Sequence, residues 1–225
     1  MDIIKRIRLA GLIMLIGMVA GIFSVAPAID SADYLKEAFR QSNQVIVAAI
    51  FQFTLSLTYM GFAILIYPVI KKFSDSLSLG FLSFRILAVS VSIIGTILLL
   101  SLLTLSEVFV QNESPNTLDF EALGTILKST RDTINHIFMV LLLCVGNIML
   151  YILFIKARLM FRWILIWGIG GSILSGIASI FVLFGAIEII TTQYLILNVP
   201  TAAFEVFLGI WLMTKGLNRK IIGSL

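Results

Sequence analysis

Apolar residues gather along this chain in long stretches, and the polar residues between them come in short segments. Six stretches reach about 20 residues or more, the length with which a helix crosses the hydrocarbon core of a bilayer. They occupy residues 9–28, 44–70, 80–108, 133–155, 163–190 and 193–214. The pattern predicts an all-α integral membrane protein, in which residues 1–225 form a single domain of six transmembrane helices.

The first stretch has two interpretations. Basic KRIR (5–8) precedes its apolar part and APA (26–28) resembles a cleavage site, as in a secretory signal peptide. The apolar part, about 18 residues long, exceeds the usual ~7–15 residues of a signal peptide. We therefore favour a membrane anchor over a cleaved signal.

Composition agrees with lipid as the solvent. The chain is 60% hydrophobic and only 12% charged, whereas soluble proteins carry about 25% charged residues. The single cysteine, Cys144, excludes a disulfide framework within the chain. The net charge of +4 comes from short basic clusters between apolar stretches. That arrangement is typical of membrane topology and does not indicate nucleic-acid binding.

The basic residues favour one side of the membrane. Eleven lie at the N-terminus, in the second and fourth gaps and in the tail: Lys5, Arg6, Arg8, Lys71, Lys72, Lys156, Arg158, Arg162, Lys215, Arg219 and Lys220. The remaining gaps hold only Lys36, Arg40, Lys128 and Arg131, diluted by acidic residues. Because basic loops stay cytoplasmic, we expect a multi-pass protein of the cell (cytoplasmic) membrane with both termini inside.

Two outer segments are long enough to fold. SADYLKEAFRQSN (31–43) predicts a short amphipathic helix capped by Ser31 or Asp33. SPNTLDFEALGTILKSTRD (114–132) has apolar residues at helical spacing, although Gly124 weakens that pattern. We expect both helices to rest on the outer membrane surface or to cap the bundle. The alternative is a lid over an outer cavity.

Small residues recur at four-residue spacing in two stretches. Gly17 and Gly21 lie in the first, and Gly168, Ser172 and Gly176 lie in the fifth. This spacing lets helix backbones approach closely. Packing within one chain is the favoured interpretation, and a homo-oligomer through these stripes is the alternative.

Several short motifs keep a fixed order along nearly the whole chain: NQ (43–44), YP (67–68), SLGFLSFR (78–85), LTLSE (103–107), RLMFRWILIWG (158–168) and PTAAFEVFLGIWLMTKG (200–216). In these motifs the chain resembles a bacterial family of six-span membrane proteins, domain-of-unknown-function family four-three-eight-six. The resemblance implies the topology and no particular chemistry. Family members often carry an acid at the positions of Gln52 and Ala88, and a proline at that of Phe161.

Ionisable side chains inside a span are the main functional candidates, because each costs about 2.5–3.5 kcal/mol at a helix centre on insertion scales. Arg85 lies about 7.5 Å along its helix from Gly80, and Glu205 about 15 Å from Lys215. Arg85 has three interpretations: reaching cytoplasmic phosphates, pairing with Glu205, or contacting a substrate.

The directions in which the two side chains point disfavour a direct pair between Arg85 and Glu205. Side chains lean toward the N-terminus of their own helix, so the two lean opposite ways across the membrane. Pairing therefore requires helix tilt or a bridging water. Glu205 is the stronger candidate, because its short side chain does not reach the headgroups and has to be neutral, paired or in a wet cavity.

Four further polar residues complete the candidate binding set. Gln52 and Asn147 are expected to make interhelical hydrogen bonds rather than ligand contacts. Tyr67 is interpreted as an interfacial anchor whose hydroxyl could reach toward Arg85. His136, at the outer mouth of the fourth stretch, is expected to be solvated or hydrogen-bonded.

The motifs of common catalytic and metal sites are missing. His136 is the only histidine, and no Cys, Asp or Glu cluster at ligand spacing accompanies it, so neither haem nor zinc is expected. No nucleophile is placed near it, and Gly-rich phosphate loops, HExxH and CxxC are absent from the sequence. The sequence predicts no enzyme activity, no cofactor and no metal.

Two functions remain open. The first is binding or transport of a small solute or lipid at an intramembrane polar site around Glu205 and Arg85, hydrated by Gln52 and Asn147. The second is a non-transporting interaction protein, such as a sensor, accessory or immunity-type factor, in which the same residues only support packing. The first requires Glu205 to titrate or bind, whereas the second tolerates Glu205→Gln.

Overall fold

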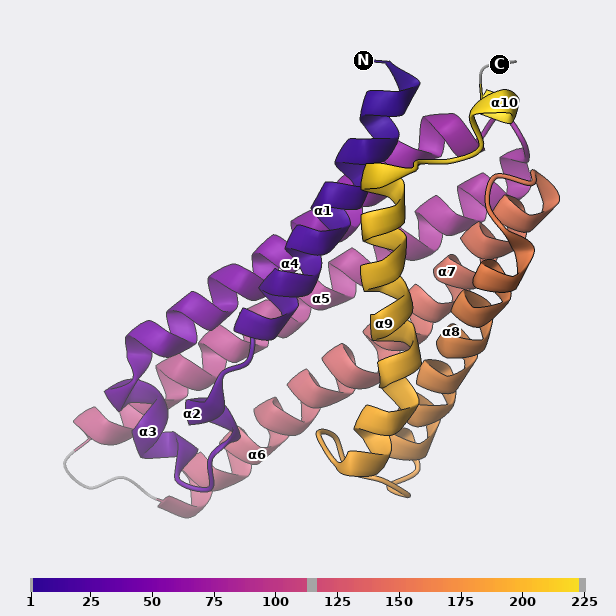
Figure 1. Ribbon diagram of the computed structural model, residues 1–225. Coiled ribbons are helices and arrows are strands. Elements are labelled where there is room, and N and C mark those ends of the chain that lie inside the picture. The colour runs from indigo at the N-terminus through magenta and orange to yellow at the C-terminus, as the bar shows by residue number, and fades with distance from the viewer. Residues whose placement is uncertain (1, 113–116, 223–225) are drawn as a thin grey trace.

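The computed structural model describes residues 2–112 and 117–222, and the regular elements in those residues are all helical (Figure 1). In chain order they are α1 (Ile3–Phe23), α2 (Pro27–Asp30), α3 (Tyr34–Arg40), α4 (Ser42–Ile70), α5 (Asp75–Gln111), α6 (Thr117–Thr133), the π-helical turn η1 (Ile134–Phe138), α7 (Met139–Lys156), α8 (Arg162–Leu183), α9 (Thr192–Thr214) and α10 (Arg219–Ile222).

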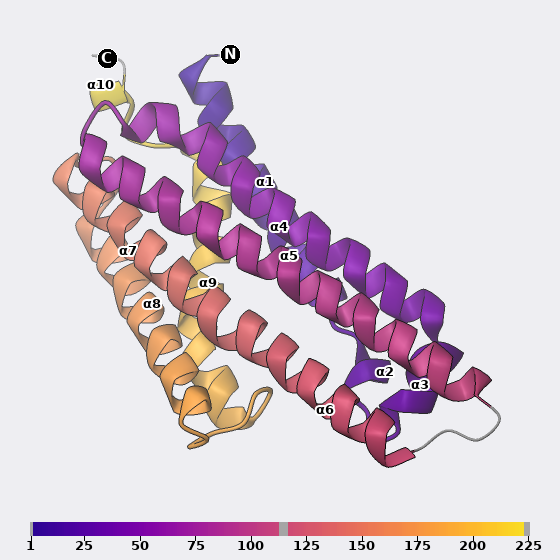
Figure 2. The ribbon, with the colours of Figure 1, turned by 180° about the vertical axis from the view of Figure 1, so that it is seen from behind.

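Six helices are long and apolar enough to cross a membrane, which confirms the predicted all-α fold and the predicted number of spans. The fourth of these is continuous through α6, η1 and α7, from Thr117 to Lys156. The protein is therefore a multi-pass membrane protein. Figures 1 and 2 show both ends of the chain at the same end of the bundle. We call this the terminal end, and the opposite end, which carries α2 and α3, the distal end.

The six spanning helices contact one another in a closed cycle: α1 packs on α4, α4 on α5, α5 on α7, α7 on α8, α8 on α9, and α9 on α1. Large buried residues of the terminal half, including Phe81, Tyr151, Phe154 and Phe204, form the main core. At the distal end a smaller core joins α2 and α3 to α4 and α5.

The contact between α1 and α9 is tight at the level of Gly11 and Gly209. A Cβ atom added to Gly11 would lie 2.6 Å from the carbonyl oxygen of Gly209, and one added to Gly209 would lie 2.7 Å from Leu15. From this crossing the two helices diverge toward the distal end (Figure 1). The cycle is therefore closed at the terminal end and open between α1 and α9 farther along.

The stripes of small residues face neighbouring helices of the same chain. A Cβ on Gly17 would lie 2.5 Å from Thr58 Oγ1 of α4, and one on Gly168 would lie 2.6 Å from the Phe204 ring of α9. The Ser172 hydroxyl donates to the carbonyl of Gly168, inside α8 itself. These residues thus pack helices within the bundle.

The helix boundaries differ from the apolar stretches for local reasons. α5 begins at Asp75 rather than residue 80, because Ser74 caps it by accepting a hydrogen bond from the Leu77 N–H at 3.4 Å. α8 ends at Leu183 rather than at residue 190. Gly185 follows with φ +67°, and the Ala186 N–H donates to the Phe181 carbonyl at 2.8 Å, the pattern that closes a helix with a left-handed glycine.

The two outer segments also fold as helices, but the second is continuous with the fourth span. α3 is the short helix expected in 31–43, whereas α6 runs without a break into η1 and α7. Residues 114–116 of the expected second helix lie outside the described residues. Gly124 does not interrupt α6, because its missing side chain leaves room for the Tyr34 hydroxyl of α3. The fourth span is therefore extended beyond the bundle on the distal side.

Candidate functional site

Arg85 is buried in the bundle, with 4% of its surface exposed. The rings of Tyr59, Phe62 and Phe81 surround its guanidinium, with centroids 5.2, 5.8 and 5.3 Å from Cζ. The interpretation that Arg85 reaches the membrane phosphates is therefore wrong. Because α5 starts at Asp75, Arg85 lies about 15 Å along the helix instead of about 7.5 Å, too deep for its side chain to reach the terminal end.

Arg85 and Glu205 are linked through Asn147. The Arg85 Nη2 donates to Asn147 Oδ1 at 2.6 Å, and Asn147 Nδ2 donates to Glu205 Oε1 at 3.3 Å. The link expected to need helix tilt or a bridging water is thus made by the side-chain amide of Asn147. We call these three residues the relay; it joins α5, α7 and α9.

A small cavity adjoins the relay. It has a volume of about 20 Å³, and Arg85 and Glu205 line it together with Met14, Met18, Thr58, Tyr59 and Phe62. About 10–15 Å³ of such volume holds one water molecule. Glu205 is only partly buried beside this cavity, and Arg85 Nε has no hydrogen-bond partner among the described residues. This cavity therefore has room for a water molecule but not for a solute.

Gln52 belongs to a second polar cluster, nearer the distal end. Its Nε2 donates to Asn135 Oδ1 at 3.2 Å and to the carbonyl oxygen of Ser92 at 3.4 Å. Gly95 of α5 leaves the space that the Asn135 side chain occupies. Gln52 thus makes the expected interhelical hydrogen bond, and its partner is the residue immediately before His136.

His136 lies in the π-helical turn η1, where the backbone widens. Its Nδ1 is 3.1 Å from the Tyr194 hydroxyl of α9, and its carbonyl oxygen accepts a hydrogen bond from Ser179 of α8 at 2.8 Å. π-Helical turns inside long helices occur frequently at functional sites. Here the turn connects the fourth span to both α8 and α9.

The Gln52–Asn135 and His136–Tyr194 pairs line a cleft of about 380 Å³ between α1 and α9. This distal cleft is lined by Gly21, Ser24, Val25, Asp30, Gln52, Leu55, Ser92, Arg131, Asn135, His136, Met139, Val140, Ile190, Tyr194 and Leu195. Gln52 lies ten residues after Ser42, where α4 begins at the distal end, so the cleft reaches about 15 Å into the bundle. Its position matches the divergence of α1 from α9.

An ion pair stands at the distal end of the cleft. Arg131 Nη1 lies 2.9 Å from Asp30 Oδ1 and 3.5 Å from Asp132 Oδ1. Arg131 is only 6% exposed, and its Nε has no hydrogen-bond partner among the described residues. A buried N–H without an acceptor is costly, so the ion pair with Asp30 is what holds the Arg131 guanidinium in the wall of the cleft.

Comparison with protein families identifies the family of this chain. Residues 9–216 match the model of a family described as domain of unknown function DUF4386. The chain belongs to this family. No curated protein and no solved structure shows significant similarity to it.

In this member of the DUF4386 family, the six candidate binding residues separate into three places. Arg85, Asn147 and Glu205 form the relay, while Gln52 and His136 line the distal cleft. Tyr67 lies apart near the terminal end, with Lys71 Nζ 6.0 Å from its ring centroid. The tyrosine that faces Arg85 is Tyr59, two turns earlier on α4.

The sequence reasoning missed the residues that complete the cleft: Asp30, Arg131, Asn135 and Tyr194. Asp30 and Arg131 are 101 positions apart and looked like loop charges. Asn135 directly precedes His136, and this pair of polar residues at the start of an apolar stretch was the available signal. Within the described residues, no group of three His, Cys, Asp or Glu side chains could hold a metal ion.

Proposed function

We propose that this protein binds a small amphipathic molecule, a solute or a lipid, in the distal cleft. The cleft itself carries the proposal: its volume of about 380 Å³ falls in the range of about 300–1,000 Å³ typical of small-molecule sites. Its polar side chains come from different helices, and apolar side chains such as Val25, Leu55 and Leu195 form the rest of the wall. Such a distribution fixes the orientation of a ligand and buries its apolar part.

The polar head of the ligand is expected at the inner wall of the cleft. The His136–Tyr194 and Gln52–Asn135 pairs offer hydrogen-bonding groups there, and the Arg131 guanidinium lies farther toward the distal end. Asp30 balances the charge of Arg131 at 2.9 Å. A head that is neutral or zwitterionic and accepts hydrogen bonds suits this lining better than a strongly charged one.

The apolar part of the ligand is expected between α1 and α9. Val25 and Leu195 line the cleft there, and they are 52% and 51% exposed. In a bilayer these exposed apolar side chains face acyl chains, so a single-chain lipid could enter sideways with its tail still in the membrane. A lysophospholipid with a choline headgroup combines the zwitterionic head and the single chain.

The relay then supports the cleft rather than contacting the ligand. Met18 lines the cavity of the relay, and Gly21, one turn farther along α1, lines the cleft. By holding α5, α7 and α9 together at this level, Arg85, Asn147 and Glu205 position the inner end of the cleft. This placement replaces the sequence-based proposal of a ligand in direct contact with Arg85 and Glu205.

We propose a binding role and no catalysis, in the cell membrane with both termini in the cytoplasm. The His136 imidazole is paired with a tyrosine hydroxyl rather than with a serine or cysteine nucleophile, which supports binding. The segregation of eleven basic residues at the terminal end supports the orientation.

Saturable binding of a photoreactive lysophosphatidylcholine to the purified protein in nanodiscs tests the proposal. Gly21→Phe should fill the cleft, because a Cβ added at Gly21 meets only Leu55, at 3.9 Å. Gly170→Phe is the matched control, since a Cβ at Gly170 of α8 meets no atom within 4 Å. Specific labelling should fall about tenfold or more in Gly21→Phe and persist in Gly170→Phe. Equal labelling of both variants would overturn the proposal and favour the interaction-protein alternative.

A further inference from the structure

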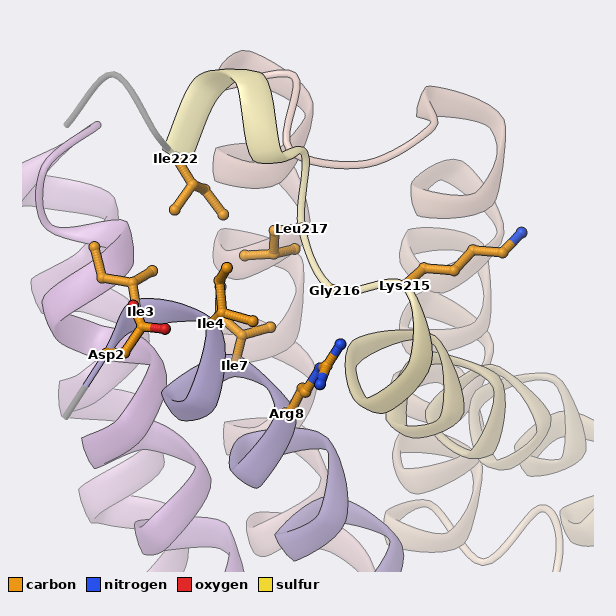
Figure 3. Close-up of a pocket in the computed structure, with 9 residues that line it drawn as sticks. All are labelled: Asp2, Ile3, Ile4, Ile7, Arg8, Lys215, Gly216, Leu217 and Ile222. Carbon is orange, nitrogen blue, oxygen red and sulfur yellow. The ribbon is translucent and has the colours of Figure 1, made fainter.

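Two grooves flank the segment Lys215–Leu217 at the terminal end. The first, of about 160 Å³, lies between the start of α1 and the C-terminal segment (Figure 3). The second, of about 410 Å³, lies between the α7–α8 loop and the end of α9. We call the second one the terminal groove. Both occur where the helices leave the apolar region, at the level of lipid headgroups.

The two grooves differ in charge. The first contains one acid, Asp2, opposite Arg8, and Figure 3 shows Lys215 pointing away from it. Among its described lining residues, the terminal groove contains the cations Arg158 and Lys215 and no acid. Its lining also includes Asn218. The terminal groove is therefore positively charged, whereas its neighbour is nearly balanced.

In the terminal groove the Lys215 ammonium and the backbone of Arg158 are held in place. Lys215 Nζ lies over the Trp211 ring, 4.6 Å from its centroid. The C-terminal segment ties down the loop of Arg158, because the Asn218 N–H donates to the Leu159 carbonyl at 2.9 Å. Arg158 has φ 52°, in the left-handed region that glycine normally occupies at a helix end.

The apolar part of the terminal groove faces the membrane. Phe161 is 61% exposed and packs edge-on against Trp211, with ring centroids 5.9 Å apart. Phe207 continues the row of aromatic rings along α9, 5.6 Å from Trp211. Aromatic side chains of this kind concentrate at the membrane interface, and here they border two cations.

We propose that the terminal groove binds an anionic phospholipid, with its phosphate beside Arg158 and Lys215 and an acyl chain along Phe161 and Trp211. Basic pockets between transmembrane helices recognise anionic headgroups in this way. The proposal concerns the end of the bundle opposite the distal cleft, and it stands whether or not the cleft binds a ligand.

Native mass spectrometry of the detergent-solubilised protein, titrated with phosphatidylglycerol or phosphatidylcholine, tests this proposal. Each cation near a membrane surface contributes about 1 kcal/mol, or about fivefold in affinity. Arg158→Asn with Lys215→Gln should therefore weaken phosphatidylglycerol binding about 25-fold and leave phosphatidylcholine binding nearly unchanged. Asparagine keeps the left-handed backbone of residue 158 accessible.

A matched double variant removes the same charge from the same end. Arg8→Gln with Lys72→Gln leaves the terminal groove intact and should weaken phosphatidylglycerol binding by no more than about threefold. Arg158→Lys with Lys215→Arg should restore most of the affinity, which shows that charge and not folding is responsible. Phe161→Ala should weaken both lipids, because it removes contact with the acyl chain.

Three results would overturn the proposal. The first is an equal loss in the groove variant and the matched variant, which would indicate diffuse surface charge. The second is unchanged phosphatidylglycerol binding in the groove variant. The third is displacement of phosphatidylglycerol by soluble glycerol phosphate at the same concentration, which would indicate a site for free phosphate. Gly21→Phe should leave phosphatidylglycerol binding intact, and this separates the groove from the distal cleft.

Discussion

Arg85 and Glu205 share a single amide, that of Asn147, although the two lie on helices α5 and α9 and are 120 positions apart in the chain. The amide orients its oxygen toward the cation at 2.6 Å and its nitrogen toward the carboxylate at 3.3 Å. An asparagine is suited to this place because it offers one acceptor and two donors. The relay therefore depends on α7 as much as on the two charged helices.

Replacing Asn147 by leucine should destabilise the protein strongly. Leucine has a similar size but leaves Arg85 and Glu205 without their shared partner in an apolar bundle, at an expected cost of about 2–4 kcal/mol. Equilibrium unfolding in mixed micelles measures the change. Asn198→Leu is the control, because within the described residues Asn198 donates to the Tyr194 carbonyl of its own helix, at 2.9 Å, and to no other helix. Equal destabilisation by both variants would contradict the relay.

Arg85 and Glu205 should be energetically coupled. Arg85→Met and Glu205→Gln each leave the other charge in the bundle without its counter-charge. The losses in unfolding free energy of the two single variants should therefore add up to more than the loss in the double variant. We expect a coupling free energy of about 1–3 kcal/mol in the double-mutant cycle. Additivity within about 0.3 kcal/mol would mean that the two charges act independently.

The crossing of α1 and α9 should tolerate no added atom. Gly11→Ala places a Cβ 2.6 Å from the Gly209 carbonyl oxygen, and a backbone group cannot rotate away. We expect destabilisation of about 1–3 kcal/mol. Gly170→Ala, where a Cβ meets no atom within 4 Å, should instead be neutral or stabilise by up to about 1 kcal/mol. The melting temperatures of the two variants, measured side by side, test this prediction. Equal melting temperatures would contradict a close contact between Gly11 and Gly209.

The sequence was sufficient to predict the all-α fold and the number of spans, because apolar length is a property of each segment alone. Helix ends were harder, since they depend on local bonds such as the cap at Ser74 and the left-handed turn at Gly185. One such error changed a functional interpretation. Starting the third span at residue 80 rather than at Asp75 placed Arg85 too near the headgroups.

The candidate site could be predicted only in part. Buried polar residues stand out in an apolar stretch, and so Arg85, Asn147, Glu205 and Gln52 were found. Their partners depend on which helices are neighbours and how each is rotated. Arg85 and Glu205 make no direct pair in the described structure, as their side-chain directions predict. The amide that links them, that of Asn147, comes from a third helix, α7. Asp30 and Arg131 were overlooked because only the fold brings these two loop-like charges together, at 2.9 Å.

The terminal end should face the cytoplasm. In a Cys144→Ala background, which removes the only cysteine, Thr125→Cys at the exposed surface of α6 should react with an impermeant maleimide in intact cells. Lys72→Cys, exposed at the α4–α5 turn, should react only after the membrane is permeabilised. The reverse pattern would invert the proposed orientation.

The most direct test of the distal cleft is to map where a photoreactive lysophosphatidylcholine attaches. With a diazirine in its acyl chain, the probe is crosslinked to the protein in nanodiscs, and labelled peptides are identified by mass spectrometry. We expect the label to concentrate on residues 21–25 at the end of α1 and on residues 190–195 at the start of α9, and to be displaced by excess unlabelled lipid. Labels spread evenly over the lipid-facing surfaces, without displacement, would show that the cleft holds no ligand of this class.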